Sequence, residues 1–151
     1  SFGLQMTKQA SGGAIVNIGD WATTRPYSGF SAYFLSKGCV ETMTRMLAIE
    51  LAERNPRVRV NAVLPGPVLM APETSDEQKD RIANDCLLKR AGSADDVAEA
   101  AYYLATSPFV TGVSLPVDGG RTIYSGGGLV SAAHQKFPQP QADTSEGQNY
   151  R

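Results

Sequence analysis

The stretch Val58-Arg59-Val60-Asn61-Ala62-Val63-Leu64-Pro65-Gly66-Pro67 is apolar and rich in β-branched residues, and it runs directly into a proline–glycine turn. A short run of this kind that is bounded by turn residues predicts a buried strand, here over 58–63. Ala14-Ile15-Val16-Asn17-Ile18 has the same character and follows a glycine pair, so an earlier strand is expected over 14–18. A later strand is expected over 113–117.

A long helix is predicted between the first two strands, over residues 32–54. Its apolar residues recur at spacings of three and four, which indicates one buried stripe: Val40, Met43, Leu47 and Leu51. Pro56 ends this helix. A second helix is expected over 75–87, where Ser75 and Gln78 match a capping box, and a third follows Ser93.

The segment Tyr33-Phe34-Leu35-Ser36-Lys37 places a phenol and an ammonium four residues apart at the start of the long helix. Such residues share one helix face, with about 5–6 Å between their Cβ atoms. An adjacent ammonium lowers the pKa of a phenol, so we expect Lys37 to make Tyr33 a usable general acid or base. Taken alone, the spacing also fits an ordinary amphipathic helix with a solvated lysine. A carboxylate, Asp20, lies thirteen positions before Tyr33.

Four motifs follow one another along the chain: a strand ending in Asn-Ile, then Tyr-x-x-x-Lys, then Val-Arg-Val-Asn-x-x-x-Pro-Gly, and finally Gly-x-x-Leu-x-Val-Asp-Gly-Gly. This order resembles the short-chain dehydrogenase/reductase family over about residues 12–121. The resemblance implies an α/β fold, namely the C-terminal half of a Rossmann-like doubly wound parallel sheet. In such sheets, ligands bind outside the carboxyl ends of the strands.

The family's glycine-rich dinucleotide loop and its first four strands have no counterpart in the chain. We therefore expect that the N-terminal half of the domain is missing and that the chain begins partway through it. Residues 1–124 are expected to form this partial domain. Residues 125–151 begin with a run of glycines and continue as a Gln/Ser/Pro-rich segment, which predicts a flexible C-terminal extension.

The resemblance also implies residue roles in an NAD(P)-dependent oxidoreductase. Tyr33 would donate a proton to the substrate, and Lys37 would assist it and hydrogen-bond the nicotinamide ribose. Met70 stands where family members often carry threonine. The cofactor would be NADP, with NAD not excluded, and the residues expected to bind it are Ile18, Tyr33, Lys37, Pro65, Gly66 and Val68.

Asp20 departs from the family pattern, which usually has serine at this position. A carboxylate repels a developing oxyanion, so Asp20 fits catalysis if it is protonated or if the substrate offers N–H donors. A pterin offers such donors, and pteridine reductases carry aspartate here. Trp21 and Tyr27 either line a pocket for a flat ring or pack the loop. The alternatives are a general alcohol dehydrogenase or ketone reductase, altered or lost catalysis, and a non-catalytic binding or assembly module.

The composition is that of an ordinary globular protein, with 42% hydrophobic and 19% charged residues and a net charge of −1. It offers no basic patch for nucleic acid and no apolar run of about 20 residues for a membrane. Its two cysteines, Cys39 and Cys86, fall on expected helices and suit a reducing compartment, so we expect a cytoplasmic protein. With one histidine, no metal site is expected. The family resemblance implies a small-molecule substrate and further copies of the protein as partners, in a dimer or tetramer.

Overall fold

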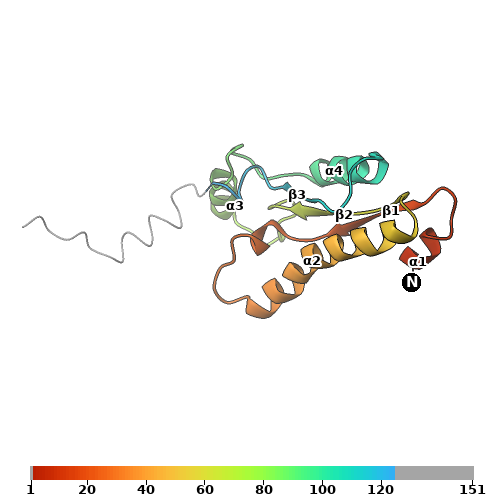
Figure 1. The fold of residues 1–151 in the computed structure, drawn as a ribbon. Coiled ribbons are helices and arrows are strands. Elements are labelled where there is room, and N and C mark those ends of the chain that lie inside the picture. The colour runs from red at the N-terminus through yellow and green to blue at the C-terminus, as the bar shows by residue number, and fades with distance from the viewer. Residues whose placement is uncertain (1, 125–151) are drawn as a thin grey trace, which may run out of the picture.

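The computed structural model describes residues 2–124, which form an α/β fold around a three-stranded parallel sheet (Figure 1). The strand order is β1 (Gly13–Ile18), β2 (Val58–Pro65) and β3 (Ser114–Val117). β1 runs in register with β2 from Gly13 opposite Val58 to Ile18 opposite Val63. The predicted fold class is confirmed, whereas the expected extension over 125–151 lies outside the described residues.

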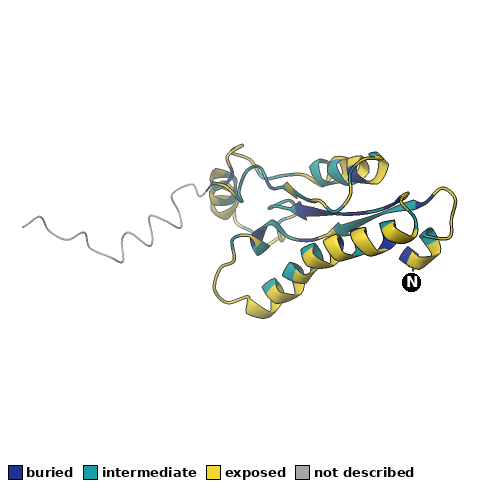
Figure 2. Cartoon of the chain, in the orientation of Figure 1, coloured by how far each residue is buried: buried dark blue, intermediate teal, exposed yellow. Residues whose placement is uncertain are grey.

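β2 is the central strand and lies between two helices. α2 (Ser31–Arg54) covers one face of the sheet and α4 (Ala94–Thr106) covers the other (Figure 1). Figure 2 shows the resulting pattern, in which β2 is buried and the outward surfaces of both helices are exposed. A parallel strand covered on both faces needs apolar residues at consecutive positions, and this explains the sequence of β2.

The side chains of β2 alternate between these two helices. Val58 and Val60 pack with Ala48 and Leu51 of α2, and they form the hydrophobic core together with Met6 from α1 (Phe2–Met6) and two further residues, Ile15 and Leu47.

Arg59 and Asn61 point toward the α4 side. The Arg59 guanidinium donates hydrogen bonds to the Leu104 and Ala105 carbonyls at 2.7 and 2.6 Å, which caps the end of α4. The Asn61 amide donates to the Val110 carbonyl at 2.9 Å and accepts from the Val113 backbone N–H at 3.2 Å. The fully buried Asn61 side chain is thereby hydrogen-bonded, as burial requires.

The buried side of α2 differs from the predicted stripe. Its buried residues are Thr44, Ala48 and Leu51, while Met43 is 45% exposed. Thr44 was not expected because it is polar, yet it donates to the Val40 carbonyl at 2.8 Å and accepts from the Asn17 amide at 2.9 Å. Within residues 2–124, no helix is both long and apolar enough to cross a membrane.

α3 (Asp76–Asn84) begins at the predicted capping box of Ser75 and Gln78. It ends at Asn84 rather than at residue 87, so the expectation for its end was wrong. The chain turns there because the following residues pack against the segment after β3, and the Leu88 N–H donates to the Gly119 carbonyl at 3.2 Å. Cys86 is consequently buried in a turn rather than on a helix.

Gly66 and Gly38 offer a matched test of how closely the end of β2 packs against the residue that follows β3. A Cβ on Gly66 would lie 2.5 Å from the Asp118 Cα, whereas a Cβ on Gly38, within α2, would meet nothing within 4 Å. We expect Gly66→Ala to destabilise the fold by about 1–3 kcal/mol through overpacking. Gly38→Ala should stabilise it by about 1 kcal/mol through helix propensity. Denaturant unfolding of both variants checks this, and equal midpoints would contradict it.

Candidate active site

The three strands end at one edge of the sheet. The chain leaves β1 at Gly19, whose N–H donates to the Val63 carbonyl at 2.9 Å, and leaves β2 at Gly66, whose N–H donates to the Val117 carbonyl at 2.9 Å. This carboxyl edge is where open parallel sheets bind ligands. Asp20 follows Gly19 directly and therefore lies at this edge.

Asp20 uses both oxygens of its carboxylate. It is the N-cap of a short helix, η1 (Trp21–Thr23), and its Oδ1 accepts from the Ala22 N–H at 2.7 Å. Its Oδ2 accepts a short hydrogen bond from the Tyr33 hydroxyl. A serine could cap η1 equally well, so the second oxygen is what distinguishes a carboxylate at this position.

Tyr33 lies in the first turn of α2 and is 40% exposed. Its hydrogen bond to Asp20, with smaller contributions from burial and the Asp20 charge, raises its pKa to about 12. The expectation that Lys37 lowers the pKa of Tyr33 is therefore wrong for this structure. The reason is that the carboxylate accepts a hydrogen bond from the phenolic O–H, and this favours the protonated phenol.

Lys37 follows Tyr33 by one helical turn and points toward the end of β1, where its ammonium donates to the Ile18 carbonyl at 3.5 Å. An ammonium has three donors, and within the described part of the chain this is the hydrogen bond that it makes. The predicted residues Ile18, Asp20, Tyr33 and Lys37 are thus brought together.

The predicted residues Pro65, Gly66 and Val68 lie at the same edge but form a separate group. Among residues 2–124, no hydrogen bond joins them to Asp20, Tyr33 or Lys37. The backbone of Asp118 approaches Gly66 so closely that a Cβ at position 66 would not fit. Glycine at this position is therefore required by packing, whatever ligand contacts it also permits.

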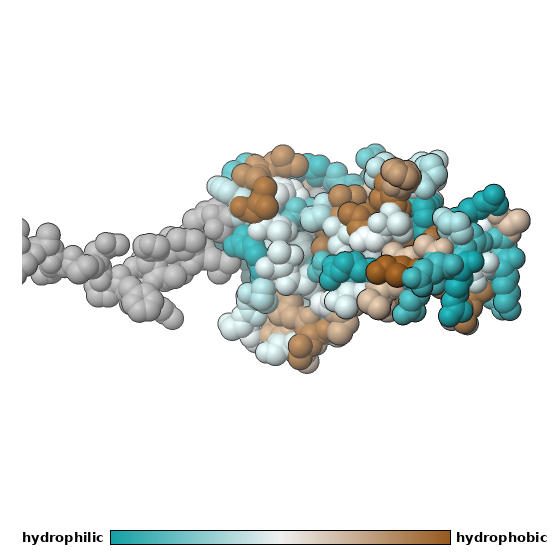
Figure 3. Space-filling model, in the orientation of Figure 1, coloured by the Kyte–Doolittle hydropathy of each residue, from teal (hydrophilic) through white to brown (hydrophobic). Residues whose placement is uncertain are grey.

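Two groups near Asp20 were not expected from the sequence as a unit. The first is an aromatic cluster in which the Tyr27 ring meets those of Phe30 and Phe34 edge to face, with centroids 5.3 and 5.0 Å apart. This cluster lies where α2 begins, and Figure 3 shows an apolar surface over the first turns of that helix.

The second unexpected group joins Arg25, Arg121 and Trp21. The Arg121 guanidinium lies 4.9 Å from the centre of the Trp21 ring. Arg25 donates to the Arg121 carbonyl at 2.8 Å. Arg121 is about a hundred positions from Trp21 and Arg25 in sequence, and no local motif signals such a contact.

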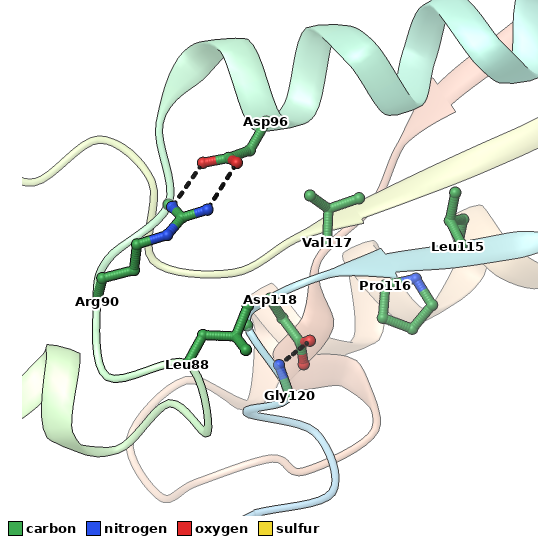
Figure 4. A pocket seen from close by; sticks show the side chains of 10 residues that line it. Leu88, Arg90, Asp96, Leu115, Pro116, Val117, Asp118 and Gly120 are labelled. Carbon is green, nitrogen blue, oxygen red and sulfur yellow. Dashed lines mark hydrogen bonds and ion pairs between the residues drawn. The ribbon is translucent and has the colours of Figure 1, made fainter.

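A pocket lies beside β3, away from Tyr33. Figure 4 shows Arg90 pointing toward Asp96 on its wall, with two hydrogen bonds of 2.8 and 2.9 Å. The guanidinium and the Ser93 N–H hold the pKa of Asp96 well below its usual range. The charges of Arg90 and Asp96 therefore pair with each other. The described residues hold no cluster of three or more metal-ligating side chains.

The architecture and the site define a class: an open parallel α/β protein with tyrosine, lysine and aspartate at the carboxyl edge of its strands. A family model described as enoyl-(acyl carrier protein) reductase matches residues 3–122. The chain belongs to the short-chain dehydrogenase/reductase family.

Individual relatives agree with this assignment. The chain is 42% identical to a 3-oxoacyl-[acyl-carrier-protein] reductase of Bos taurus over 115 residues, which cover 76% of this chain and 46% of that protein. It is 37% identical to a dihydromonapterin reductase of Escherichia coli O6:K15:H31 over 107 residues, covering 71% of this chain and 43% of that protein. The chain thus spans about half the length of the curated relatives it matches.

A solved structure shares the fold as well. A short-chain type dehydrogenase/reductase from Mycobacterium ulcerans superposes with a TM-score of 0.73 at 29% identity, covering 89% of this chain and 50% of that one. The matched part of this chain therefore corresponds to half of that protein.

The Asp20–Tyr33 contact predicts an unusual titration. Since the pKa of Tyr33 is raised to about 12, Tyr33 should be half ionised only at about pH 12, whereas a free phenol is half ionised at about pH 10. The contact should stabilise the fold below about pH 10 and lose this contribution as the pH rises toward the folded-state pKa. The difference between the near-ultraviolet titrations of the wild type and Tyr33→Phe measures the ionisation.

Asp20→Asn should return the titration of Tyr33 toward the ordinary value. The amide oxygen can keep the cap on Ala22, but the NH2 group then faces Tyr33 and cannot accept the phenolic hydrogen bond, and the charge is also lost. Asp76→Asn, which changes an exposed carboxylate on α3, is the matched control and should leave it unchanged. An unaltered titration in Asp20→Asn would contradict the assigned cause.

Proposed function

We propose that the chain supplies the proton-transfer half of an NAD(P)H-dependent reductase that acts on a pterin-like substrate or on another nitrogen-containing carbonyl or imine. The observation that carries this proposal is the hydrogen bond from Tyr33 to Asp20, with Lys37 one helical turn away. Asp20, Tyr33 and Lys37 are the proposed catalytic residues.

The donors at the sheet edge fit a nicotinamide nucleotide. Lys37 has donors left for ribose hydroxyls after its bond to Ile18. Pro65, Gly66 and Val68 would border the nicotinamide on the neighbouring strand. When bound, the reduced nucleotide supplies the hydride. We propose NADP, the cofactor that the pteridine reductase resemblance favours.

The chain's own residues would move the proton. Tyr33 is held in its protonated form by Asp20, so it can donate its O–H proton to the substrate atom that gains electrons as the C=N or C=O bond is reduced. A phenolate beside an ionised carboxylate is unfavourable. The proton is therefore replaced along the same hydrogen bond, from solvent through the carboxyl of the half-buried Asp20, while the Lys37 ammonium offsets the transient charge.

The pterin class follows from the free acceptors of Asp20. An ionised carboxylate has about four acceptor positions, and two are filled by Ala22 and Tyr33. The remaining positions match the amino and ring N–H donors of a pterin. The 37% identity to a dihydromonapterin reductase supports the same substrate class.

A second candidate keeps the chemistry and changes the substrate to a simple ketone or a 3-oxoacyl group. It is favoured by the 42% identity to a 3-oxoacyl-[acyl-carrier-protein] reductase. Asp20 would then contact some other polar group of the substrate.

Reductase assays on the complete gene product separate these candidates. Tyr33→Phe should lower turnover of a dihydropterin by about 10²–10⁴-fold, because it removes the proton donor, while Tyr102→Phe, at an exposed tyrosine on α4, should not change it. Asp20→Ser keeps a cap for η1 and should lower dihydropterin turnover but leave ketone turnover intact. Equal turnover of ketones with no reduction of dihydropterin would exclude the pterin proposal.

We also propose that the protein associates with further copies of itself through the outer face of α2. Met46 and Ile49 are 50% and 57% exposed there, and Leu35 is 73% exposed. A shallow apolar groove runs along the same face between Phe34 and Met46. A contiguous apolar surface of this kind is typical of protein interfaces.

Charge placed on this face should block association. We expect Met46→Glu with Ile49→Glu to convert the complete gene product to a smaller species, measured by light scattering after gel filtration. Leu69→Glu changes an apolar residue that is 87% exposed outside α2, and should not alter the mass. An unchanged mass in the double variant would contradict the proposal.

A further inference from the structure

The residues that follow β3 form a fixed turn. The buried Asp118 carboxylate accepts from the Gly120 N–H at 2.9 Å and from the Thr122 N–H at 2.6 Å. Gly119 and Gly120 have φ values of +61° and +80°, which favour glycine. A Cβ on Gly120 would lie 2.7 Å from Leu87. Arg121 therefore leaves this turn in a defined direction.

The Arg121 side chain, partly buried with 18% of its surface exposed, joins two other segments. Its guanidinium lies over the Trp21 ring, with 4.9 Å to the ring centre. It also pairs with the Asp85 carboxylate at 3.2 Å and donates to the Ile82 carbonyl at 3.3 Å. One side chain thus links the loop after β1 to the end of α3.

The loop after β1 also bonds to the segment that carries Arg121. Arg25 donates hydrogen bonds to the Arg121 and Tyr124 carbonyls, both at 2.8 Å. At its other end, this loop enters α2 at Phe30, which makes no side-chain hydrogen bond to cap the helix. On the other side, the Thr23 hydroxyl donates to Glu41 of α2 at 2.8 Å. These contacts hold the segment that carries Asp20 from its far side, and the hydrogen bond from the Gly19 N–H to the Val63 carbonyl holds it at the end of β1.

We propose that Arg121 is a positioning residue for the reductase reaction: by holding Trp21 it keeps the adjoining Asp20 in contact with Tyr33. This inference rests on the proposed function for the role of Asp20 in proton transfer. A planar guanidinium can cover an aromatic ring and pair with a carboxylate at the same time, which a lysine ammonium does less well.

A purely structural role for Arg121 makes a different prediction. If Arg121 only links the segment after β3 to α3, its removal lowers thermal stability and leaves the Asp20–Tyr33 contact intact. If it positions Asp20, its removal also loosens that contact. The titration of Tyr33 reports on this contact directly, and it does not depend on any activity.

The experiment uses the complete gene product with Arg121→Ala, Arg121→Lys and a control, Arg81→Ala. Arg81 is an exposed arginine on α3 that pairs with Glu77 at 2.5 Å. We expect Arg121→Ala to return the titration of Tyr33 toward the ordinary value and to lower kcat about 10–100-fold, the effect of a small misplacement of a reacting group. KM for the nicotinamide nucleotide should stay within about twofold, because Lys37 is untouched. Arg121→Lys should restore part of both changes, and Arg81→Ala should match the wild type.

A double-mutant cycle with Trp21→Ala tests whether Arg121 acts on Asp20 through Trp21. If Arg121 acts through Trp21, adding Arg121→Ala to Trp21→Ala should change the Tyr33 titration no further. Asp85→Asn, which loosens Arg121 without removing it, gives the same test if Arg121→Ala does not fold. It should shift the titration in the same direction.

A lower melting temperature with an unchanged Tyr33 titration would overturn the positioning role. Additive effects in the cycle would overturn the route through Trp21. Absence of all reductase activity in the wild type, with the titration shifted as expected in Arg121→Ala, would instead reject the proposed function and retain the coupling of Arg121 to Asp20.

Discussion

The burial of β2 on both of its faces is the constraint on which the rest of the structure depends. Val58 and Val60 pack against α2. Arg59 and Asn61 satisfy their polar groups on the α4 side through backbone carbonyls. β1 and β3 pair with the two edges of β2, and all three strands are parallel. Their carboxyl ends consequently share one edge of the sheet, and this places Asp20 and the start of α2 near each other.

The position of the Asp20–Tyr33 contact follows from that frame in two steps. Gly19 lets β1 leave the sheet over Leu64, whose Cδ2 would lie 2.4 Å from any Cβ at this position. The hydrogen bond from Asn17 to Thr44 then fixes α2 lengthwise against β1. Tyr33 precedes Thr44 by about three helical turns, which brings its hydroxyl to Asp20. The contact thus depends on Gly19, Asn17 and Thr44, whose side chains and backbone take no part in the hydrogen bond itself.

Local patterns predicted the parts of this structure that depend on short-range physics. The β-branched run of β2, the capping box of Ser75 and Gln78, and the Tyr33–Lys37 spacing each follow from neighbouring residues. The buried Thr44 was missed because its hydroxyl is satisfied by a partner on another element. The link between Arg121 and Trp21 was missed for a related reason, since its members meet only after the sheet has formed. The predicted direction of the pKa shift of Tyr33 was wrong, because the spacing placed Lys37 nearby but could not show that Asp20 accepts a hydrogen bond from the phenol.

That reversed shift bears on the chemistry of the site. A tyrosine activated by an ammonium alone would be partly ionised and could serve as a base as readily as an acid. Here the carboxylate raises the pKa to about 12, so the phenol stays protonated at neutral pH. Reduction requires a protonated donor, whereas oxidation requires the phenolate as acceptor. Under the proposed reductase function, the pairing of Asp20 with Tyr33 keeps the proton donor in its protonated form between turnovers. The acceptor positions of the carboxylate that Ala22 and Tyr33 do not use are then free for a substrate that offers N–H donors.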